Sequence, residues 1–274
     1  MGLLKIDAEK CKRDGICVAE CPSAIIKLGN DGSVPTLVPG DDDFCLRCGH
    51  CVAVCPHGAL SHMEVPVADC TPIQKNLSIS PEQAVQFLRS RRSVRIFKDK
   101  PVDQASLTRL IKIARYAPSA SNSQLVEWIV HTDKDMIREF AGKAIEWMRQ
   151  YLEKDPQAKS FAYMPLLVEA WDSGYDAVLR NAPALIVASA PREASNGLVD
   201  VTLALSYLDL AAPTLGLGTC WAGLLQGAIL SNPVLKAEIG IPEGHPYHYP
   251  MMIGFSKAKY FRLPERKQPK MTFK

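Results

Sequence analysis

A run of closely spaced cysteines constrains this chain more than any other feature of its sequence. The spacing is C-x2-C-x2-C-x3-C-P, formed by Cys45, Cys48, Cys51, Cys55 and Pro56. Three cysteines two residues apart can surround one [4Fe-4S] cluster from a single tight loop. Zinc sites instead pair C-x2-C units that lie far apart in the chain. The run therefore predicts an iron–sulfur cluster, with zinc or buried structural cysteines as the alternatives.

An altered copy of the same motif lies upstream. Cys11, Cys17 and Cys21 take its first, third and fourth positions, and Asp14 takes the second. With both copies, residues 1–65 resemble a bacterial two-cluster ferredoxin in which one cysteine is replaced by aspartate. In that family the fourth cysteine of each motif ligates the other cluster. The resemblance implies one cluster on Cys11, Asp14, Cys17 and Cys55, and a [4Fe-4S] cluster on Cys45, Cys48, Cys51 and Cys21.

The aspartate leaves the form of the first cluster open. Asp14 could ligate the fourth iron, water could take that position, or the iron could be lost to leave [3Fe-4S]. Oxygen is a harder ligand than thiolate and holds iron less firmly in a sulfur-rich site. We favour a labile [4Fe-4S] cluster over [3Fe-4S], with an empty site as the alternative. His50 and His57 lie in or beside the second motif, either as hydrogen-bond donors to cluster sulfur or as ordinary surface histidines.

Composition and charge exclude several classes of protein. The chain has 274 residues, 47% of them apolar and 22% charged, as in ordinary globular proteins. A net charge of +3 gives no reason to expect nucleic acid or a membrane surface as partner. No apolar run approaches the ~18 residues that span a bilayer. Charges interrupt the first ten residues, so we expect no signal peptide, and the cysteines indicate metal ligation in a reducing cytoplasm.

Residues 66–79 read as a linker, because they carry two prolines and little periodicity. Cys70 lies in it, outside both cysteine motifs, and is interpreted as a spare thiol. A helix is predicted to start after Ser80, with Pro81 in its first turn and Gln83 completing a capping box. A second domain is therefore predicted over residues 80–274.

Several segments of this second domain have a clear pattern. The segment Arg91-Arg92-Ser93-Val94-Arg95 offers three guanidinium groups and a hydroxyl, which suit a phosphate, although basic helix ends are often only solvated. The apolar helix predicted over 199–215 should be covered on nearly every side, as in a dimer interface. Further helices are predicted over 103–116 and 136–152, and strands over 34–38, 128–130, 184–188 and 247–255.

Residues 80–274 resemble the nitroreductase family of FMN-dependent oxidoreductases. The likeness rests on Arg91–Arg95, on Ala117-Pro118-Ser119 with Asn122 and Gln124, on Leu217–Gly223, and on the tail from Gly254 through Arg262 to Arg266. The chain departs from the family at Leu125, where proline is common, and at Gly254-Phe255-Ser256, where Gly-Tyr-Pro is common. With its first 65 residues included, the whole chain resembles the ferredoxin–nitroreductase fusions.

The resemblance implies an α+β fold: a small ferredoxin-like iron–sulfur domain, then a nitroreductase-type α+β sandwich paired as an intertwined homodimer. It implies one FMN at each edge of the dimer interface. The implied phosphate and ribityl contacts are Arg91, Arg92, Ser93 and Arg95, with Arg262 or Arg266 from the tail. Pro118, Ser119, Ala120, Asn122 and Gln124 would reach the flavin from the other subunit, and Trp221, Ala222 and Gly223 would lie along its ring. Cys220 is interpreted as packing.

The combined features predict an oxidoreductase in which clusters relay single electrons to FMN for reduction of a small acceptor, such as a nitroaromatic or a quinone. The donor would be an external low-potential protein, such as a ferredoxin, or NAD(P)H, for which the chain has no glycine-rich fingerprint. The alternative is an electron-transfer flavoprotein that serves a protein partner. Residues 155–175 would cover the flavin and select the substrate, or form an ordinary surface excursion. His131, His245 and His248 are interpreted as structural.

Overall fold

The structure, a computed structural model, describes residues 2–29, 32–154 and 162–274. The chain divides into two compact units, the first made of residues 1–79 with 121–123 and the second of 80–120 with 124–274. Residues 155–161, part of the segment predicted to cover the flavin, lie outside the described residues.

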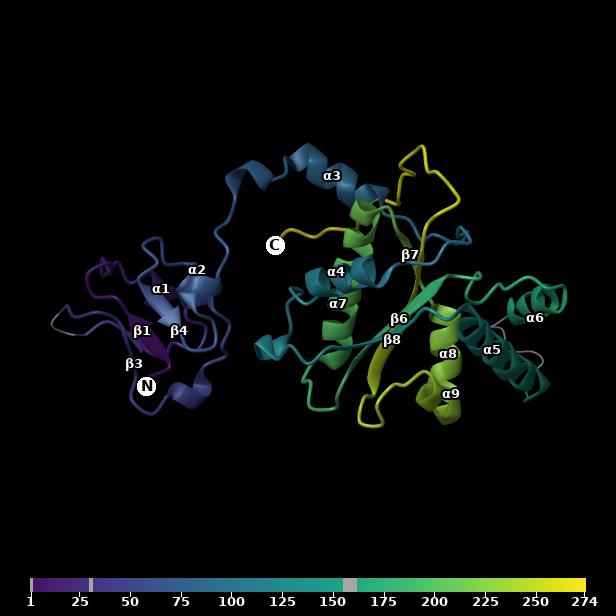
Figure 1. The fold of residues 1–274 in the computed structure, drawn as a ribbon, viewed down its shortest axis with the longest axis horizontal. Coiled ribbons are helices and arrows are strands. Elements are labelled where there is room, and N and C mark those ends of the chain that lie inside the picture. Colours follow the sequence, from purple (N-terminus) through teal and green to yellow (C-terminus); the bar gives the residue numbers. More distant parts are fainter. Residues whose placement is uncertain (1, 30–31, 155–161) are drawn as a thin grey trace. The chain divides into compact units, whose positions relative to one another are not determined.

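The first unit is built from two small antiparallel sheets (Figure 1). Strand β1 (Leu4–Ile6) pairs with β4 (Leu60–His62), and β2 (Ile26–Lys27) pairs with β3 (Thr36–Leu37). The unit also contains two short helices, α1 (Ile16–Glu20) and α2 (His50–Ala53). It has three 3-10 turns, η1 (Asp42–Phe44), η2 (Val67–Asp69) and η3 (Lys75–Leu77). Its buried core is Cys17, Val52 and Leu60. Domains with so small a core commonly gain stability from a bound metal or from disulfides.

A four-stranded antiparallel sheet forms the centre of the second unit. Its strand order is β5 (Glu127–His131), β6 (Ala184–Ala190), β8 (Tyr247–Gly254) and β7 (Gly218–Trp221). Every residue of β6 is buried, because helices cover both faces of the sheet.

The helices form a layer on each side of this sheet. Helices α5 (Lys134–Lys154), α6 (Met164–Asp172), α8 (Gly223–Ser231) and α9 (Pro233–Glu238) share one core with Leu185 and Val187 of β6. Helices α4 (Gln104–Ala114) and α7 (Gly197–Ala211) share the other core with Ala184 and Ile186. Successive residues of a strand point to opposite faces, so β6 serves both cores. The predicted α+β class is confirmed.

The predicted capped helix that starts after Ser80 is confirmed. Helix α3 (Pro81–Ser90) follows Ser80, whose hydroxyl accepts the Gln83 N–H at 3.2 Å. The Gln83 side chain accepts the Ser80 N–H at 2.8 Å, which closes the capping box. One predicted strand is shorter than expected, and one strand was not predicted. The predicted strand over 34–38 is only two residues long, and β7 was missed because its four residues begin with glycine and lack an alternating pattern.

Helix α7 departs from the expectation about apolar runs, and its expected coverage by a second chain stays a prediction. With the 3-10 turn η6 (Ala212–Leu215) it forms a 19-residue helix with mean hydropathy 1.4, long and apolar enough by those measures to cross a membrane. The expectation that no such stretch exists was wrong, because Asp200 and Asp209 interrupt the run without lowering its mean hydropathy enough. In addition, Leu198, Val199 and Tyr207 are exposed on the single chain. The buried face packs on the sheet, as in the core helix of a globular domain.

Candidate functional site

The predicted cluster ligands gather around two separate cavities of the first unit. Cys21, Cys45, Cys48 and Cys51 line one cavity, and Cys11, Asp14, Cys17 and Cys55 line the other. In each set one cysteine comes from the other motif, as the ferredoxin resemblance implied. All nine cysteines are free thiols.

The sequence spacing of both cysteine motifs is that of cluster-binding ferredoxins. Within the described parts of the chain, no three Cys, His, Asp or Glu side chains are close enough to share one ion. A zinc ion would need its ligands within ~2.3 Å of one centre, whereas each ligand of a cubane cluster binds a different iron. The ligands of a cluster therefore stand farther apart around a larger space.

The thiols also interact electrostatically within each set. Burial raises the pKa of the Cys51 thiol to about 11, and the neighbouring Cys48, Cys45 and Cys21 add to the rise. Burial likewise raises the pKa of Cys17, with Cys55 and Cys11 adding to it. Crowded thiols of this kind ionise readily only when a cation binds, because metal coordination deprotonates them.

Asp14 occupies the same backbone setting as Cys48. Each follows an arginine and precedes a glycine, and all four flanking residues have positive φ: Arg13 (59°), Gly15 (73°), Arg47 (51°) and Gly49 (72°). Positive φ is uncommon for arginine, so its repetition indicates two equivalent loops built for one purpose. The Asp14 carboxylate accepts the Ile16 N–H at 3.2 Å and lies 3.6 Å from His57 Nε2.

His62 is a residue that the sequence did not indicate. Its Nε2 lies 3.6 Å from Cys45 Sγ, and its Nδ1 accepts the Glu64 N–H at 3.0 Å. The side chain is 2% exposed, and burial lowers its pKa. No motif spacing points to this histidine, because the pairing of β4 with β1 places it beside the cavity. By contrast, His50, considered for this role, is exposed.

In the second unit the arginine-rich segment runs beside β7. Ser93 forms a parallel bridge with Thr219, and the Val94 N–H donates to the Thr219 carbonyl at 2.8 Å. Two of the predicted FMN motifs, Arg91–Arg95 and Leu217–Gly223, are therefore neighbours in one chain. Gly218 makes this approach possible, since a Cβ there would lie 2.3 Å from Val94 Cγ2.

We predict that Gly218→Ala destabilises the second unit and loosens the arginine-rich segment. The added methyl must push Val94 away, and overpacking of this kind costs about 1–3 kcal/mol. Urea unfolding followed by circular dichroism measures the loss. Gly244→Ala is the matched control, because a Cβ there meets nothing within 4 Å and is expected to be neutral. Equal stability of the two variants would contradict the prediction.

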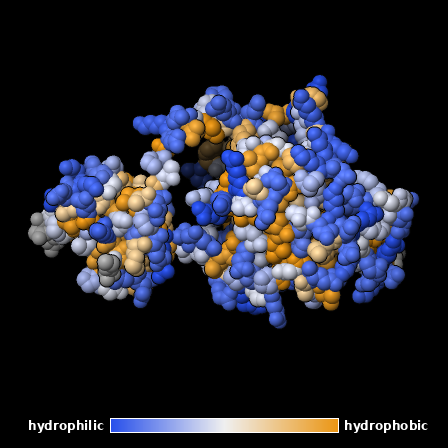
Figure 2. Space-filling model, viewed as in Figure 1, coloured by the Kyte–Doolittle hydropathy of each residue, from blue (hydrophilic) through white to orange (hydrophobic). Residues whose placement is uncertain are grey.

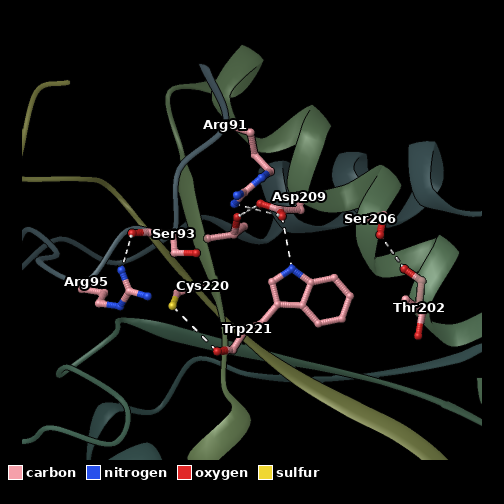
Figure 3. A network of polar contacts seen from close by, with 9 residues as sticks. Arg91, Ser93, Arg95, Thr202, Ser206, Asp209, Cys220 and Trp221 are labelled. Carbon is pink, nitrogen blue, oxygen red and sulfur yellow. Dashed lines mark hydrogen bonds and ion pairs between the residues drawn. The ribbon is translucent and has the colours of Figure 1, made fainter. Parts of the chain in front are cut away.

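A buried carboxylate on α7 connects the two motifs (Figure 3). Asp209 accepts hydrogen bonds from the Thr219 hydroxyl and from Trp221 Nε1, the latter at 3.2 Å, and lies 3.6 Å from Arg91 Nη1. The Trp221 indole also meets the Tyr249 ring edge-on at 5.2 Å. The indole is therefore held in the packing of its own unit. Cys220 is buried beside it, and burial raises the pKa of its thiol.

The C-terminal tail lies along the end of α3. The Arg92 guanidinium is 6.0 Å from the Tyr260 ring centroid, and Arg89 pairs with Glu265 at 2.9 Å. These contacts hold the stretch that carries the exposed Arg262 and Arg266 near the arginine-rich segment. A contribution of either arginine to the same anion stays a prediction.

Hydrogen bonds to helix α7 and within the loop itself hold residues 117–124. The Ala120 N–H donates to Asp200 of α7 at 3.1 Å, and the Gln124 N–H donates to the Ser119 hydroxyl at 3.0 Å. Gln124 has a φ of 51°, an uncommon conformation for its residue type. Across the residues that the structure describes, no hydrogen bond or ion pair joins Pro118, Ser119, Ala120 or Gln124 to Arg91–Arg95. Their contact with a flavin from the other subunit stays a prediction.

Comparison with known proteins agrees with this geometry. The model of the nitroreductase family matches residues 88–255, which is more than half of the chain. The chain belongs to the nitroreductase family. A 4Fe-4S dicluster domain model matches residues 3–56 of this family member. The predicted combination of a ferredoxin-like domain with a nitroreductase domain is therefore confirmed.

Relatives of this nitroreductase-family chain are found in archaea and bacteria. A protein provisionally named an NADH dehydrogenase/NAD(P)H nitroreductase in Archaeoglobus fulgidus is 26% identical over 195 residues, which cover 69% of this chain and 95% of the relative. An FMN reductase [NAD(P)H] of Bacillus subtilis is 29% identical over 192 residues, covering 67% and 71%. A Bacteroides fragilis nitroreductase crystallised with bound FMN has a TM-score of 0.57 at 19% identity, covering 70% of this chain and 98% of that one. At that identity the likeness shows the fold.

Proposed function

We propose that this chain is an FMN-dependent oxidoreductase whose two iron–sulfur clusters relay single electrons to FMN for reduction of a small acceptor, such as a nitroaromatic or a quinone. The observation that carries the proposal is the pair of cysteine-lined cavities in a chain whose second unit belongs to the nitroreductase family. Relatives named for FMN reduction and for FMN binding support the choice of flavin.

The arginine-rich segment and its neighbour offer what FMN requires. Arg91, Arg92, Ser93 and Arg95 supply guanidinium and hydroxyl donors that suit the phosphate and ribityl chain. The close approach at Gly218 brings Ser93 and Val94 against Gly218 and Thr219 of β7, the strand that leads on to Trp221, Ala222 and Gly223. When bound, FMN accepts electrons singly and supplies them in pairs. Reduction of a nitro group to nitroso consumes two electrons and two protons and releases one water.

The cysteine sets would hold two clusters of different lability. We propose [4Fe-4S] on Cys21, Cys45, Cys48 and Cys51, and a cluster with one labile iron on Cys11, Asp14, Cys17 and Cys55. The environment of a reducing cytoplasm suits both. The prediction is that anaerobically purified, iron-replete protein lacks the oxidised three-iron EPR signal. A strong signal of that type would instead support [3Fe-4S] at the Asp14 site.

A second copy of the chain is expected to cover its exposed apolar side chains. Leu198, Val199 and Tyr207 are exposed on α7, Val85 and Leu88 on α3, and Phe261 and Phe273 in the tail. Figure 2 shows apolar side chains over the middle of the larger unit, in the region of α7. We predict a homodimer of twice 30.1 kDa by light scattering after gel filtration. A monomer at micromolar concentration would contradict the intertwined arrangement.

The test of the function is anaerobic turnover with two donors. Chemically reduced ferredoxin and NADPH are each supplied to the holoprotein, and cluster and flavin absorbance are followed by stopped flow against a panel of nitroaromatic and quinone acceptors. Reduction of the clusters before the flavin, followed by acceptor turnover, is the expected result. Fast flavin reduction by NADPH alone would remove the donor role of the clusters. Turnover with a protein acceptor only would favour an electron-transfer flavoprotein.

A further inference from the structure

The second unit holds a cavity of about 420 Å³ with a cationic lining. Arg95, Arg138, Arg180 and Lys257 line it, and none of them pairs with a carboxylate within residues 2–29, 32–154 and 162–274. The fifth cation of the lining, Lys134, is already paired with Asp99. A cleft lined mainly by one sign of charge concentrates ligands of the opposite sign.

The loop that carries Arg180 is built around a buried carboxylate. Asp176 is fully buried and accepts backbone N–H groups from Val178, Leu179 and Asn181 at 2.8–2.9 Å. Because these bonds satisfy it within the loop, Asp176 does not act as a counter-ion for the cavity. The loop holds Arg180 and Asn181 at φ 59° and 49°. Two consecutive residues in this uncommon conformation indicate a loop shaped for a function.

The two arginines of the cavity are oriented by neutral partners. Arg180 Nη1 donates to the Tyr175 hydroxyl at 2.6 Å, and Arg138 Nη1 donates to the Asn181 side-chain oxygen at 3.1 Å. The Arg138 guanidinium also lies 4.8 Å from the Trp171 ring centroid. These contacts orient both side chains, and no ion pair to a carboxylate is formed by either guanidinium within the described residues. The lining holds five cations against the three carboxylates of Asp99, Asp135 and Asp176, so its net charge is positive.

The cavity adjoins the segment proposed to bind flavin. Arg95 belongs to both, since it lies in the arginine-rich segment that runs beside β7. Arg95 and Arg180 also both act electrostatically on the buried Cys220 of β7. A molecule in the cavity would therefore lie close to the strand whose end leads into Trp221, Ala222 and Gly223.

We propose that this cavity binds the acceptor itself, as a small molecule whose carboxylate is held by Arg138 and Arg180. Planar guanidinium groups bind carboxylates with two parallel hydrogen bonds, which gives geometric selectivity as well as affinity. This inference rests on the proposed function and narrows its substrate class from any nitroaromatic or quinone to those that carry an anionic group. Tyr175, half-exposed at the same wall, offers an aromatic surface for the rest of the molecule.

The test compares two probes of nearly equal shape, 4-nitrobenzoate and the uncharged 4-nitrobenzamide. Isothermal titration of the oxidised holoprotein gives the dissociation constant of each. Arg138→Gln and Arg180→Gln are each expected to weaken 4-nitrobenzoate binding about tenfold and to leave 4-nitrobenzamide binding unchanged. Arg180→Lys should recover part of the loss. Arg109→Gln, an exposed arginine of α4, is the matched control and should change neither constant.

Three results would overturn the proposal. These are an unchanged constant for 4-nitrobenzoate in both glutamine variants, an equal loss for both probes, or loss of FMN from the variants, which would assign the cavity to the flavin. If the wild-type protein is found to contain no FMN, the proposed function fails instead. Binding of 4-nitrobenzoate to that protein would still be measurable, so the two failures are distinguishable.

A second inference concerns His62 and stands on separate contacts. Its Nδ1 accepts the Glu64 N–H at 3.0 Å, so that nitrogen carries no proton. The ring is then neutral with its proton on Nε2, the nitrogen that lies 3.6 Å from Cys45 Sγ. Burial at 2% exposure keeps water from competing for this contact.

We infer that His62 donates a hydrogen bond to the Cys45 thiolate and raises the reduction potential of the cluster held by Cys21, Cys45, Cys48 and Cys51. Reduction adds negative charge to the cluster, and a donor to its sulfur stabilises the more negative state. His62 is a positioning residue in this role and binds no iron. The inference depends on the proposed cluster, which iron and sulfide analysis checks independently.

Potentiometric EPR titration measures the effect. His62→Leu is expected to lower the midpoint potential of this cluster. For a one-electron couple, each tenfold loss in the equilibrium constant for reduction corresponds to a shift of 59 mV. His62→Gln keeps an N–H donor and should recover part of the shift. His131→Leu, a histidine of β5 in the second unit, should leave the midpoint unchanged. An unchanged midpoint in His62→Leu with full iron content overturns the inference.

A second measurement keeps the inference testable if His62→Leu loses its cluster. Wild-type protein labelled with 15N-histidine is reduced, and pulsed EPR detects the magnetic coupling between the cluster and nearby histidine nitrogen. The expected result is a coupling that disappears in His62→Gln. No histidine coupling in the wild type would overturn the inference whatever the variants do.

Discussion

Cys48→Ala is expected to empty the cavity that Cys48 shares with Cys21, Cys45 and Cys51, and to abolish turnover driven by reduced ferredoxin. Removing one of four thiolates leaves one iron without its protein ligand, and cluster binding is coupled to the folding of so small a unit. Iron and acid-labile sulfide should fall by about half if the other cluster remains, because each cluster contributes about four irons. Metal analysis and anaerobic acceptor reduction measure both effects.

Cys70→Ala is the matched control for this prediction. Cys70 is exposed and outside both cavities, and its thiol donates a hydrogen bond of 3.4 Å to the Pro66 carbonyl. The variant should keep all of its iron and its full rate with reduced ferredoxin. In Cys48→Ala, photochemical reduction of the flavin should persist, because the second unit does not depend on that cluster for folding. Full iron content in Cys48→Ala would show that Cys48 is no ligand.

The cysteine sites could be predicted from the sequence because their chemistry is local. The residues of each motif lie within about a dozen positions, so spacing alone indicates that Cys45, Cys48 and Cys51 face one centre. The equivalence of Asp14 and Cys48 was also visible, since the same arginine–x–glycine pattern surrounds both. His62 could not be found in this way. It reaches Cys45 only because β4 pairs with β1, and a lone histidine on a short strand carries no spacing signal.

In the second unit, too, the sequence indicated residues that belong to motifs and not residues that only the tertiary structure brings together. Motif order in the sequence indicated the family, and the bridge between Ser93 and Thr219 then gave two of those motifs a shared geometry. Arg138 and Arg180 belong to no motif and are two of 32 basic residues in the chain. What distinguishes them is that both line one cavity, and that the buried Asp176 shapes the loop that carries Arg180. Both properties depend on tertiary structure.

Asp209→Ala is expected to have the largest effect on stability of any substitution in the second unit considered above. The carboxylate is 4% exposed and serves three partners at once, namely the Thr219 hydroxyl, Trp221 Nε1 and Arg91. Its removal leaves buried donors unsatisfied and an arginine without its anion. Breaking a buried pair of this kind costs about 3–5 kcal/mol, and partial exposure of Arg91 places the expected loss near the lower value. Urea unfolding followed by circular dichroism measures it.

Asp172→Ala is the control that distinguishes the loss of the buried Asp209 carboxylate from the loss of an ordinary surface ion pair. Asp172 pairs with Arg149 at the surface, where both side chains are more than one third exposed, so its removal should cost about 0–1 kcal/mol. The free energy of unfolding of Asp209→Asn should fall between those of Asp209→Ala and Asp172→Ala. The amide oxygen still accepts one hydrogen bond, but it attracts Arg91 only weakly. If Arg91 needs Asp209 to hold its position, both Asp209 variants should also release FMN during gel filtration. Stability and flavin content equal to those of Asp172→Ala would show that Asp209 does not organise this site.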